Sequence, residues 1–573
     1  MAELKDLLRA QALPVNGAKA ELVARLASSG SMPKTLSLDE KDELNAPGGL
    51  IEKTPWWTSP EILTPQALTA IGVVFLMVAA AFVFRPTWLG FSPNYEYDLI
   101  DFDAAQARTF AEELVSFGHD DWQGRMSGTD EEANVSAYIE SQFAAMGMTT
   151  KRHSFQVPMH HVDSEPSLRI CIQGAFGNSP CEGPLAFGSQ ITSFQHRVDY
   201  VIQGFSGRSE YLFNDDVQLT DLGNGSDEAL WTAAAGTIGY VRSGGSVSGN
   251  TDLFSLAAEN NLAGLIRVNK NYNCGKIEGN DCVPIFKGSG IDAVKEANGG
   301  SIPTELPFIA MSKDAGEILE RLIFNATGTT GVLEMIIDVT NDEERTIYVP
   351  CGEIKGKTSE VVIVGGHHDT VYNGPGAIDD TSGSASVLEM ARQMSEVVNA
   401  TGKPERTLRF CTWGGEEEGL YGSRAYVDAF QSSLRDNLRL YINLDMNHVD
   451  ADFSNRGNSL TLFGNTPEDM DHIKRITELY KNERSDVADR YDIQLSILDG
   501  PKGAADGMPY NSDHGPFVYD LGKERGRAVV CYGSGSWEYH TYLDSLDRLN
   551  PESMGVSVTI YGTYMRFLAY SDY

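Results

Sequence analysis

The sequence predicts a protein of the α/β class, in which helices flank a mixed, largely parallel sheet. From about residue 346 the pattern runs strand, loop and helix and then repeats, which is typical of parallel sheets. Between residues 156 and 344 it changes to short β-like runs with frequent Gly, Asn and Ser, which indicates a β-rich insert. We therefore expect one domain built from residues 98–155 and 345–573, interrupted by the insert at 156–344.

The first 84 residues predict a different organisation. Residues 1–30 hold two amphipathic helical patterns joined by a turn through Pro14 and Gly17, and residues 31–66 have the composition of a linker. Residues 67–84 form an uncharged apolar run at the lower end of transmembrane length. The flanking tryptophans and the distance from the N-terminus favour a transmembrane helix over a buried core helix or a cleaved signal peptide.

The distribution of basic residues predicts the orientation of this helix. Seven Lys or Arg residues precede it, whereas only Arg85 lies between the helix and Asp103. The positive-inside rule then places the N-terminus in the cytoplasm and the larger domain outside a cell membrane crossed once.

The charge balance argues against one class of partner. The chain has 45 Lys and Arg residues against 80 Asp and Glu residues, a net charge of −35. Because nucleic-acid binding requires a basic face, we do not expect it of the main domain. For residues 1–30 the charge balance does not decide whether they bind nucleic acid.

The seven cysteines predict two kinds of environment. Cys171 with Cys181, and Cys274 with Cys282, are closely spaced in loop-like sequence and could form disulfides outside the cell. Cys411 and Cys531 lie in apolar runs and are expected to be buried thiols. Cys351 is left unassigned.

Polar clusters follow the predicted central strands. Four apolar runs, at 361–366, 407–413, 438–444 and 528–533, have the character of buried strands. Three of them have a cluster of His, Asp or Glu just after their carboxyl end, and the fourth is followed within eight residues by Tyr539 and His540. Since ligands bind at the carboxyl ends of strands in open α/β sheets, we expect these clusters to meet in one crevice.

The residue types in these clusters indicate metal-assisted hydrolysis. Two histidines and several carboxylates, without cysteine, suit Zn²⁺, with Mn²⁺ or Co²⁺ as substitutes. The carboxylates are too many for one structural zinc and suit two metals sharing a bridging carboxylate. A further carboxylate could then accept a proton from water.

The motifs GGHHDT, GAIDDTSG, WGGEEEGLYGS, NLDM and YH occur in the order found in the M28 zinc peptidases, and the chain resembles that family. The resemblance implies the zinc exopeptidase fold and the activity of the di-zinc aminopeptidases or their carboxypeptidase relatives. The insert resembles a protease-associated (PA) domain, on GTIGYVRSGG and SLAAENNLAGLIRVN. Residues 1–30 resemble SAP and LEM-like modules.

Roles follow from the resemblance, residue by residue. It implies that His367 and Asp445 bind one zinc, Glu417 and His540 bind the second, and Asp379 bridges both. It implies Glu416 as general base, Asp369 as the group that orients His367, and Tyr539 as a donor to the oxyanion. His368 and Asp380 are expected to have no direct role, Glu418 to face away, and Asp513 and His514 to shape the cleft.

The function predicted from these features is a membrane-anchored di-zinc aminopeptidase acting on peptides. A carboxypeptidase or dipeptidase of the same family is the nearest alternative. A catalytically inactive receptor-like homologue would have lost ligands or the base, and here every expected position is filled. A tether between membrane and nucleic acid, through residues 1–30, is a third possibility.

Overall fold

The structure is a computed structural model. It describes residues 95–172, 190–215, 217–242, 249–269, 273–277, 282–324, 331–451, 456–522 and 525–571. The predicted N-terminal module, linker and transmembrane helix lie outside these residues. In the described ranges, no helix combines the length and apolar character needed to cross a membrane.

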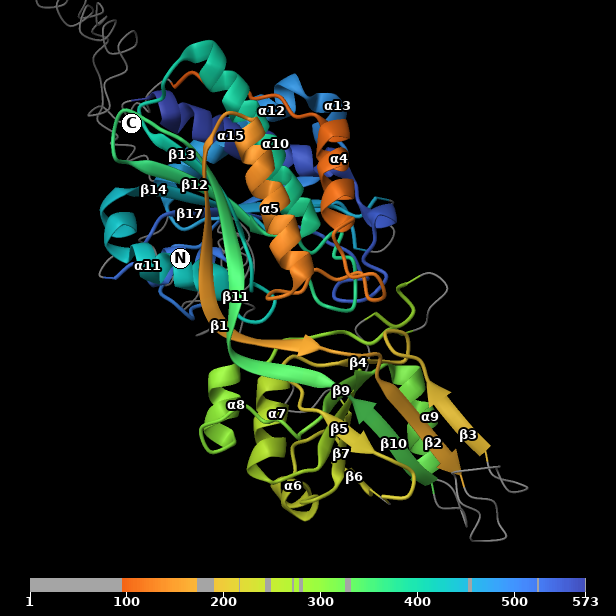
Figure 1. Cartoon of the computed structure of the whole chain (residues 1–573). Helices are drawn as coiled ribbons and strands as arrows, with labels where there is room; N and C mark the ends of the chain where they lie inside the picture. Colours follow the sequence, from red (N-terminus) through yellow and green to blue (C-terminus); the bar gives the residue numbers. More distant parts are fainter. Residues whose placement is uncertain are drawn as a thin grey trace, which may run out of the picture. The chain divides into compact units, whose positions relative to one another are not determined.

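An eight-stranded mixed sheet forms the centre of the larger domain (Figure 1). Its order is β1-β11-β13-β12-β14-β17-β15-β16. The bounds are Thr149–Val162 (β1), Val339–Ile354 (β11), Val361–His367 (β12), Thr407–Trp413 (β13), Leu438–Leu444 (β14), Ser459–Gly464 (β15), Asp492–Ile497 (β16) and Ala528–Gly533 (β17).

The four strands predicted from apolar runs are the four adjacent central strands. β12 pairs in parallel with β13 and with β14, and β14 pairs in parallel with β17. Nearly all of their side chains are buried, because helices cover both faces of the sheet. The α/β class is therefore confirmed.

Two helical layers cover this sheet. One apolar core joins the sheet to α4 (Ala104–Val115), α5 (Asp130–Ala145), α10 (Thr381–Thr401), α12 (Pro467–Glu483), α13 (Ser485–Ala488) and α15 (Pro551–Tyr570). A second core joins the other face to α11 (Tyr421–Asn437) and α14 (His514–Tyr519). A short 3-10 helix, η5 (Leu546–Arg548), precedes α15.

The predicted insert contains two further sheets, between β1 and β11 in the chain. A five-stranded sheet has the order β4-β9-β8-β7-β6 and a four-stranded sheet the order β3-β2-β10-β5. Their strands are β2 (Ser167–Ile172), β3 (Gln190–Phe194), β4 (Tyr200–Ile202), β5 (Ser209–Tyr211), β6 (Leu219–Asp221), β7 (Ile238–Arg242), β8 (Gly264–Val268), β9 (Phe308–Met311) and β10 (Gly331–Ile337). The helices are α6 (Glu228–Ala233), α7 (Asn250–Glu259), α8 (Ile291–Ala297) and α9 (Lys313–Ile323).

Two long strands carry the chain into and out of this insert. β1 and β11 pair antiparallel from Thr149 and Glu353 to Val162 and Val339. Figure 1 shows both strands running from the helix-covered sheet to the two smaller sheets. One continuous ladder therefore connects the two regions.

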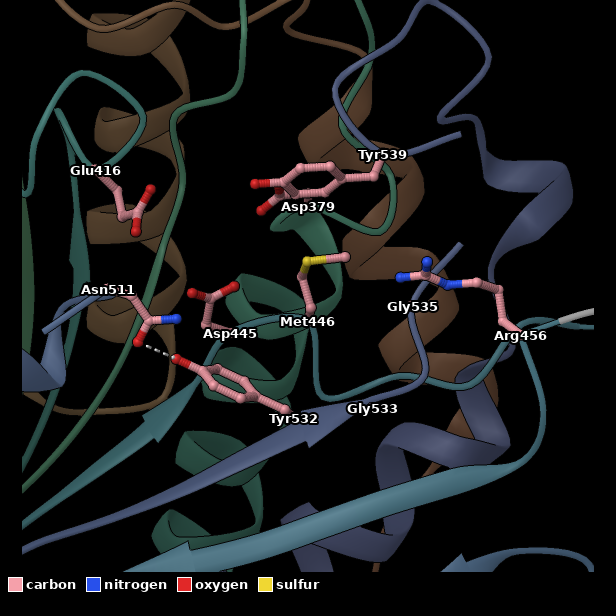
Figure 2. Close-up of a pocket in the computed structure, with 10 residues that line it drawn as sticks. All are labelled: Asp379, Glu416, Asp445, Met446, Arg456, Asn511, Tyr532, Gly533, Gly535 and Tyr539. Atoms are coloured by element: carbon pink, nitrogen blue, oxygen red, sulfur yellow. Dashed lines mark hydrogen bonds between the residues drawn. The ribbon is translucent and has the colours of Figure 1, made fainter. Parts of the chain in front are cut away.

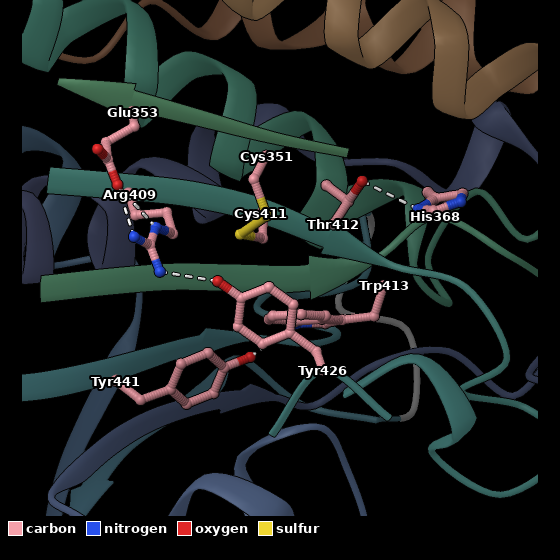
Figure 3. Close-up of a disulfide and its surroundings, with 9 residues drawn as sticks. All are labelled: Cys351, Glu353, His368, Arg409, Cys411, Thr412, Trp413, Tyr426 and Tyr441. Carbon is pink, nitrogen blue, oxygen red and sulfur yellow. Dashed lines mark hydrogen bonds and ion pairs between the residues drawn. A yellow bond between two sulfur atoms is a disulfide. The ribbon is translucent and has the colours of Figure 1, made fainter. Parts of the chain in front are cut away.

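The cysteines correct one prediction. Cys411 is not a buried thiol, because it forms a disulfide with Cys351 (Figure 3). The two residues are direct partners in the antiparallel pairing of β11 with β13, a pairing that the separate strands do not reveal in sequence. Cys274 and Cys282 are bonded as expected, and Cys171 is disulfide-bonded, while Cys181 lies outside the described residues. Cys531 is a buried free thiol, which confirms that prediction.

Candidate metal centre

The predicted site residues lie at the carboxyl edge of the central strands. β12 ends at His367, which is in register with Trp413 at the end of β13. Asp445 follows β14 directly, and Glu416 follows β13 by three residues. The parallel register of these strands brings residues far apart in the chain to one edge, as the sequence predicts.

Two groups of metal-binding side chains form at this edge. His367, Asp379 and Asp445 place ligand atoms within 4.8 Å of one another, and so do Asp379, Glu417 and His540. Asp379 belongs to both groups. These are the five residues that the resemblance gives as ligands, including the shared carboxylate.

The Nε2 atoms of the two histidines both face carboxylate oxygens of the ligand groups. His540 Nε2 lies 2.9 Å from Asp379 Oδ2 and 2.8 Å from Glu417 Oε2. Nevertheless this nitrogen has no hydrogen-bond partner among the described residues. His367 Nε2 lies 3.2 Å from Asp379 Oδ1 and 3.8 Å from Asp445 Oδ1.

The other ring nitrogen of each histidine fixes the tautomer. His367 Nδ1 lies 3.1 Å from the carbonyl oxygen of Asp369, and His540 Nδ1 lies 2.9 Å from that of Phe286. A carbonyl oxygen only accepts, so in each ring Nδ1 carries the proton and donates it. In a neutral imidazole Nε2 then presents its lone pair to the centre, as a metal ligand requires. The residues present therefore fit a pair of metal ions.

The loop that carries Asp379 is held by a buried carboxylate. Asp544 accepts hydrogen bonds from the backbone N–H groups of Ile378 (2.9 Å) and Asp379 (3.1 Å). Burial raises the pKa of Asp544 to about 8, although the two N–H groups favour its charged form.

Asp380 organises the backbone around the centre rather than joining either ligand group. Its carboxylate accepts from the backbone N–H groups of His367 (3.1 Å), Gly383 (2.8 Å) and Met446 (3.0 Å). It therefore connects the end of β12, the start of α10 and the residue after Asp445.

Glu416 lies beside the two groups and faces an open cleft of about 290 Å³ (Figure 2). The residues lining the cleft are Asp379, Glu416, Asp445, Met446, Arg456, Asn511, Tyr532, Gly533, Gly535 and Tyr539. Burial raises the pKa of Glu416 well above its usual value, His367 opposes this, and Asp445 adds to it. A carboxylate with a raised pKa is suited to accepting a proton from water.

Tyr539 lies across the cleft from Glu416, as Figure 2 shows. Its hydroxyl oxygen accepts a hydrogen bond of 3.0 Å from Lys287 Nζ, a residue of the insert. Burial lowers the pKa of Lys287, while Glu417, Asp379 and Glu416 raise it.

The neighbouring His368 and Glu418 belong to neither ligand group in the described part of the chain. His368 Nε2 lies 3.0 Å from Glu132 Oε1 and His368 Nδ1 lies 2.9 Å from Thr412 Oγ1, so it does not join the ligand groups. Glu418 is buried rather than solvated, and neither of its carboxylate oxygens has a hydrogen-bond partner among the described residues. Burial and the charges of Asp369 and Glu417 raise the pKa of Glu418 well above its usual value.

Asp513 and His514 are both fully buried. His514 Nε2 donates a hydrogen bond of 2.9 Å to the carbonyl oxygen of Pro509, because a carbonyl oxygen only accepts. Burial raises the pKa of Asp513 to about 8. Neither residue belongs to a metal-binding group in the described part of the chain.

A scan against family models matches Peptidase family M28 over residues 351–564 and the SAP domain over residues 1–29. Residues 351–564 form an M28 peptidase domain. All five residues of the two ligand groups lie inside the matched range. The chain also carries a SAP domain at its N-terminus, which is the resemblance predicted for residues 1–30.

Curated proteins of known name are similar to part of this chain. An aminopeptidase of Pseudomonas aeruginosa is 33% identical over 233 residues, 39% of this chain and 41% of the relative. A probable leucine aminopeptidase 2 of Aspergillus fumigatus is 32% identical over 205 residues, 34% of this chain and 39% of the relative. The chain thus spans about two fifths of the length of these curated relatives.

Solved structures share the fold more widely. An aminopeptidase from Aneurinibacillus sp. strain AM-1 has a TM-score of 0.53 at 22% identity, covering 82% of this chain and 94% of that chain. BSAP, a zinc aminopeptidase from Bacillus subtilis, has a TM-score of 0.55 at 19% identity, covering 82% and 97%. The zinc aminopeptidase-like fold is therefore confirmed.

Sequence reasoning missed several residues that position the M28 site. The backbone of Phe286 and the side chain of Lys287 reach it from the insert, Asp544 holds the Asp379 loop, and Arg125 is buried behind it. Arg125 donates to the carbonyl oxygens of His368 and Pro375. No periodicity or motif spacing signals these contacts, because each joins segments distant in sequence.

Proposed function

We propose that the protein is a zinc-dependent exopeptidase that removes N-terminal residues from peptides. One observation carries the proposal: two groups of metal-binding side chains share Asp379 at the carboxyl edge of the parallel central strands. Two neighbouring metals bridged by one carboxylate are typical of hydrolytic sites.

The two ligand groups would hold two zinc ions. His367 and Asp445 would hold one ion and Glu417 and His540 the other, with Asp379 between them. When bound, such a pair supplies a water molecule of lowered pKa and polarises a carbonyl group. Mn²⁺ or Co²⁺ are expected to substitute, because the ligands are imidazole and carboxylate.

The protein's own groups then handle the proton and the developing charge. Glu416 accepts the proton of the attacking water and delivers it to the leaving amine. Tyr539 donates a hydrogen bond from its hydroxyl group to the substrate carbonyl oxygen as negative charge forms on that oxygen. Asp369 orients His367, since its backbone oxygen accepts the Nδ1 proton and its Oδ1 lies 3.4 Å from the same nitrogen.

The names of relatives favour an aminopeptidase. Several of the relatives matched are named as aminopeptidases, whereas a probable glutamate carboxypeptidase of Arthroderma benhamiae is 29% identical over 237 residues. A carboxypeptidase is therefore the second candidate.

The other regions receive proposals of their own. We propose that the insert is a PA domain, since β7 and β8 are parallel neighbours with α7 between them in the chain. We further propose that residues 67–84 anchor the chain in the cell membrane, with the SAP domain in the cytoplasm and the M28 domain outside. The substrates would then be extracellular peptides. Salt-dependent DNA binding by the full chain would test whether the SAP domain binds nucleic acid.

A panel of peptides tests the activity. Turnover is compared for a peptide with both termini free, its N-acetylated form and its C-terminally amidated form. An aminopeptidase loses only the N-acetylated substrate, a carboxypeptidase loses only the amidated substrate, and an inactive homologue turns over none of the three. Removal of metal by a chelator should abolish turnover, and added Zn²⁺ should restore it.

The substitution Glu416→Gln tests the base. We expect kcat to fall by about 10³-fold while both zinc ions are retained, because the amide cannot accept the proton. Zinc content by elemental analysis is measured alongside. Near-normal kcat in the zinc-loaded variant would exclude Glu416 as the base.

A further inference from the structure

The insert contacts the candidate centre through residues 285–288. His540 Nδ1 donates to the carbonyl oxygen of Phe286 (2.9 Å), and the Phe286 N–H donates to the carbonyl oxygen of His540 (3.2 Å). A Cβ at Gly288 would lie only 2.7 Å from the carbonyl oxygen of Glu417. This segment therefore lies against two residues of the same ligand group.

The backbone of Lys287 is held in a fixed place within the insert. Its N–H donates to Gln203 Oε1 (3.1 Å), and its carbonyl oxygen accepts from Asn250 Nδ2 (3.1 Å) and from the N–H of Gly204 (3.1 Å). Gln203 and Asn250 are both buried and bonded to each other. These bonds fix the point from which the Lys287 side chain extends towards the centre.

That target is the hydroxyl group of Tyr539. Lys287 Nζ lies 3.0 Å from the Tyr539 oxygen and 4.2 Å from the centre of its ring. An ammonium group has donors only, so the phenol oxygen is the acceptor. The proton of Tyr539 is consequently directed away from Lys287, and Tyr539 itself lines the cleft together with Asp379 and Glu416.

We propose that Lys287 of the insert is a positioning residue that aims the Tyr539 O–H at the substrate carbonyl oxygen and polarises it. The inference rests on the proposed hydrolytic function. The hydrogen bond is charge-assisted, because its donor is an ammonium group, and it strengthens the phenol O–H as a donor. The insert thus contributes to stabilising the oxyanion, although it supplies no residue to either ligand group.

A double-mutant cycle separates this role from a general electrostatic one. The variants are Lys287→Met, Tyr539→Phe and both together, with Lys295→Met as control. Lys295 is an insert lysine that pairs with Glu343 on the surface. Loss of one oxyanion donor costs about 10²-fold in kcat, so we expect that for Tyr539→Phe, and about 10-fold for Lys287→Met.

The double variant gives the decisive comparison. If Lys287 acts through the phenol, adding Lys287→Met to Tyr539→Phe lowers kcat no further, and KM changes little throughout. Lys287→Arg should recover part of the loss, since it restores a cationic donor. If the two losses multiply, Lys287 acts independently of Tyr539 and the proposal is wrong. Zinc content and thermal unfolding confirm that each variant is folded and loaded.

A binding measurement tests the role without turnover. The phosphonic acid analogue of leucine mimics the tetrahedral anion, whereas leucine does not. By calorimetry on the zinc-loaded protein, we expect Lys287→Met to weaken phosphonate binding about 10-fold and to leave leucine binding unchanged. No binding of the phosphonate to the wild type, or equal affinity in Lys287→Met, would overturn the proposal. Should the wild type hydrolyse no peptide, the proposed function fails, and this measurement still decides the role of Lys287.

Discussion

The two histidines of the metal centre are oriented by different regions of the molecule. His367 donates through Nδ1 to the carbonyl oxygen of Asp369, two residues further along the same loop. His540 makes the same bond to Phe286, 254 positions away in the insert. Both bonds fix the proton on Nδ1 and orient the imidazole ring. Only the first bond is made within the M28 domain itself.

This difference shows that the two ligand groups have unequal support. The group of His367, Asp379 and Asp445 is built on strands β12 and β14 and the loop held by Asp544. The group of Asp379, Glu417 and His540 is packed against residues 286–288 of the insert. Substitutions in the insert should therefore affect the second group selectively.

The largest expected effect is a loss of stability when the disulfide between β11 and β13 is removed. The Cys351–Cys411 disulfide joins β11, which returns from the insert, to β13, which leads to Glu416. Replacing both cysteines by serine should lower the free energy of unfolding by about 2–4 kcal/mol, since the bond closes a long loop. Chemical denaturation measures it. Zinc affinity should stay unchanged, and a selective loss at one ion would show that the disulfide also positions the centre.

Asp369→Asn should weaken the locally supported half of the site. The substitution removes the charge beside His367 Nδ1 but keeps an oxygen able to accept from the N–H of Glu417. Loss of such a partner typically costs about 10- to 100-fold in metal affinity, here for the first ion. Competition with a chromophoric chelator resolves the two ions. Equal weakening of both would mean that the two halves are not independent.

Gln203→Leu should weaken the other half. Gln203 holds the 285–287 segment through bonds to the carbonyl oxygen of Ile285 (3.2 Å) and the N–H of Lys287 (3.1 Å). We expect about a 10-fold loss of affinity for the ion held by His540, with the first ion unaffected. Gln156→Leu is the matched control, since Gln156 bonds only on the surface to Thr346. Unchanged affinity would show that the M28 domain orients His540 unaided.

The smallest effect at neutral pH should come from His160, which lies between Phe205 and Phe286 at the junction of the two regions. Neither ring nitrogen has a hydrogen-bond partner in the described part of the chain, and burial lowers the pKa to about 3. The unfolded chain binds the proton at a higher pH, near 6.5, than the folded one. The stability contributed by neutral His160 is thus complete above pH 6.5 and is lost as the pH falls towards 3.

His160→Phe should remove this dependence and raise the free energy of unfolding by about 1 kcal/mol, because it buries no unpaired nitrogen. Denaturation at several pH values between 3 and 7 measures both effects. The neighbouring His161→Phe serves as control, since His161 is partly exposed and pairs with Asp163 at 2.7 Å. An unchanged pH dependence in His160→Phe would assign it to other groups.

Much of the site was predictable because its residues follow strands. The apolar runs ending at Gly366, Trp413, Leu444 and Gly533 became adjacent parallel strands, so the polar residues after them had to meet at one edge. Asp379 was identifiable only by resemblance, because an aspartate before a helix is ordinarily a cap. The prediction for Cys411 failed because antiparallel pairing of β11 with β13 put Cys351 directly opposite.

The sequence pattern by itself predicted the four central strands and their carboxyl edge, because strand pattern is a local property of the chain, and the five ligand residues followed from the resemblance in motifs. Only the tertiary structure decided how these residues are held. The bond from His540 to Phe286, the bond from Lys287 to Tyr539 and the Cys351–Cys411 disulfide each join positions that no periodicity relates. They exist because the paired strands β1 and β11 return the insert to the M28 domain, and packing there brings residue 286 to the centre.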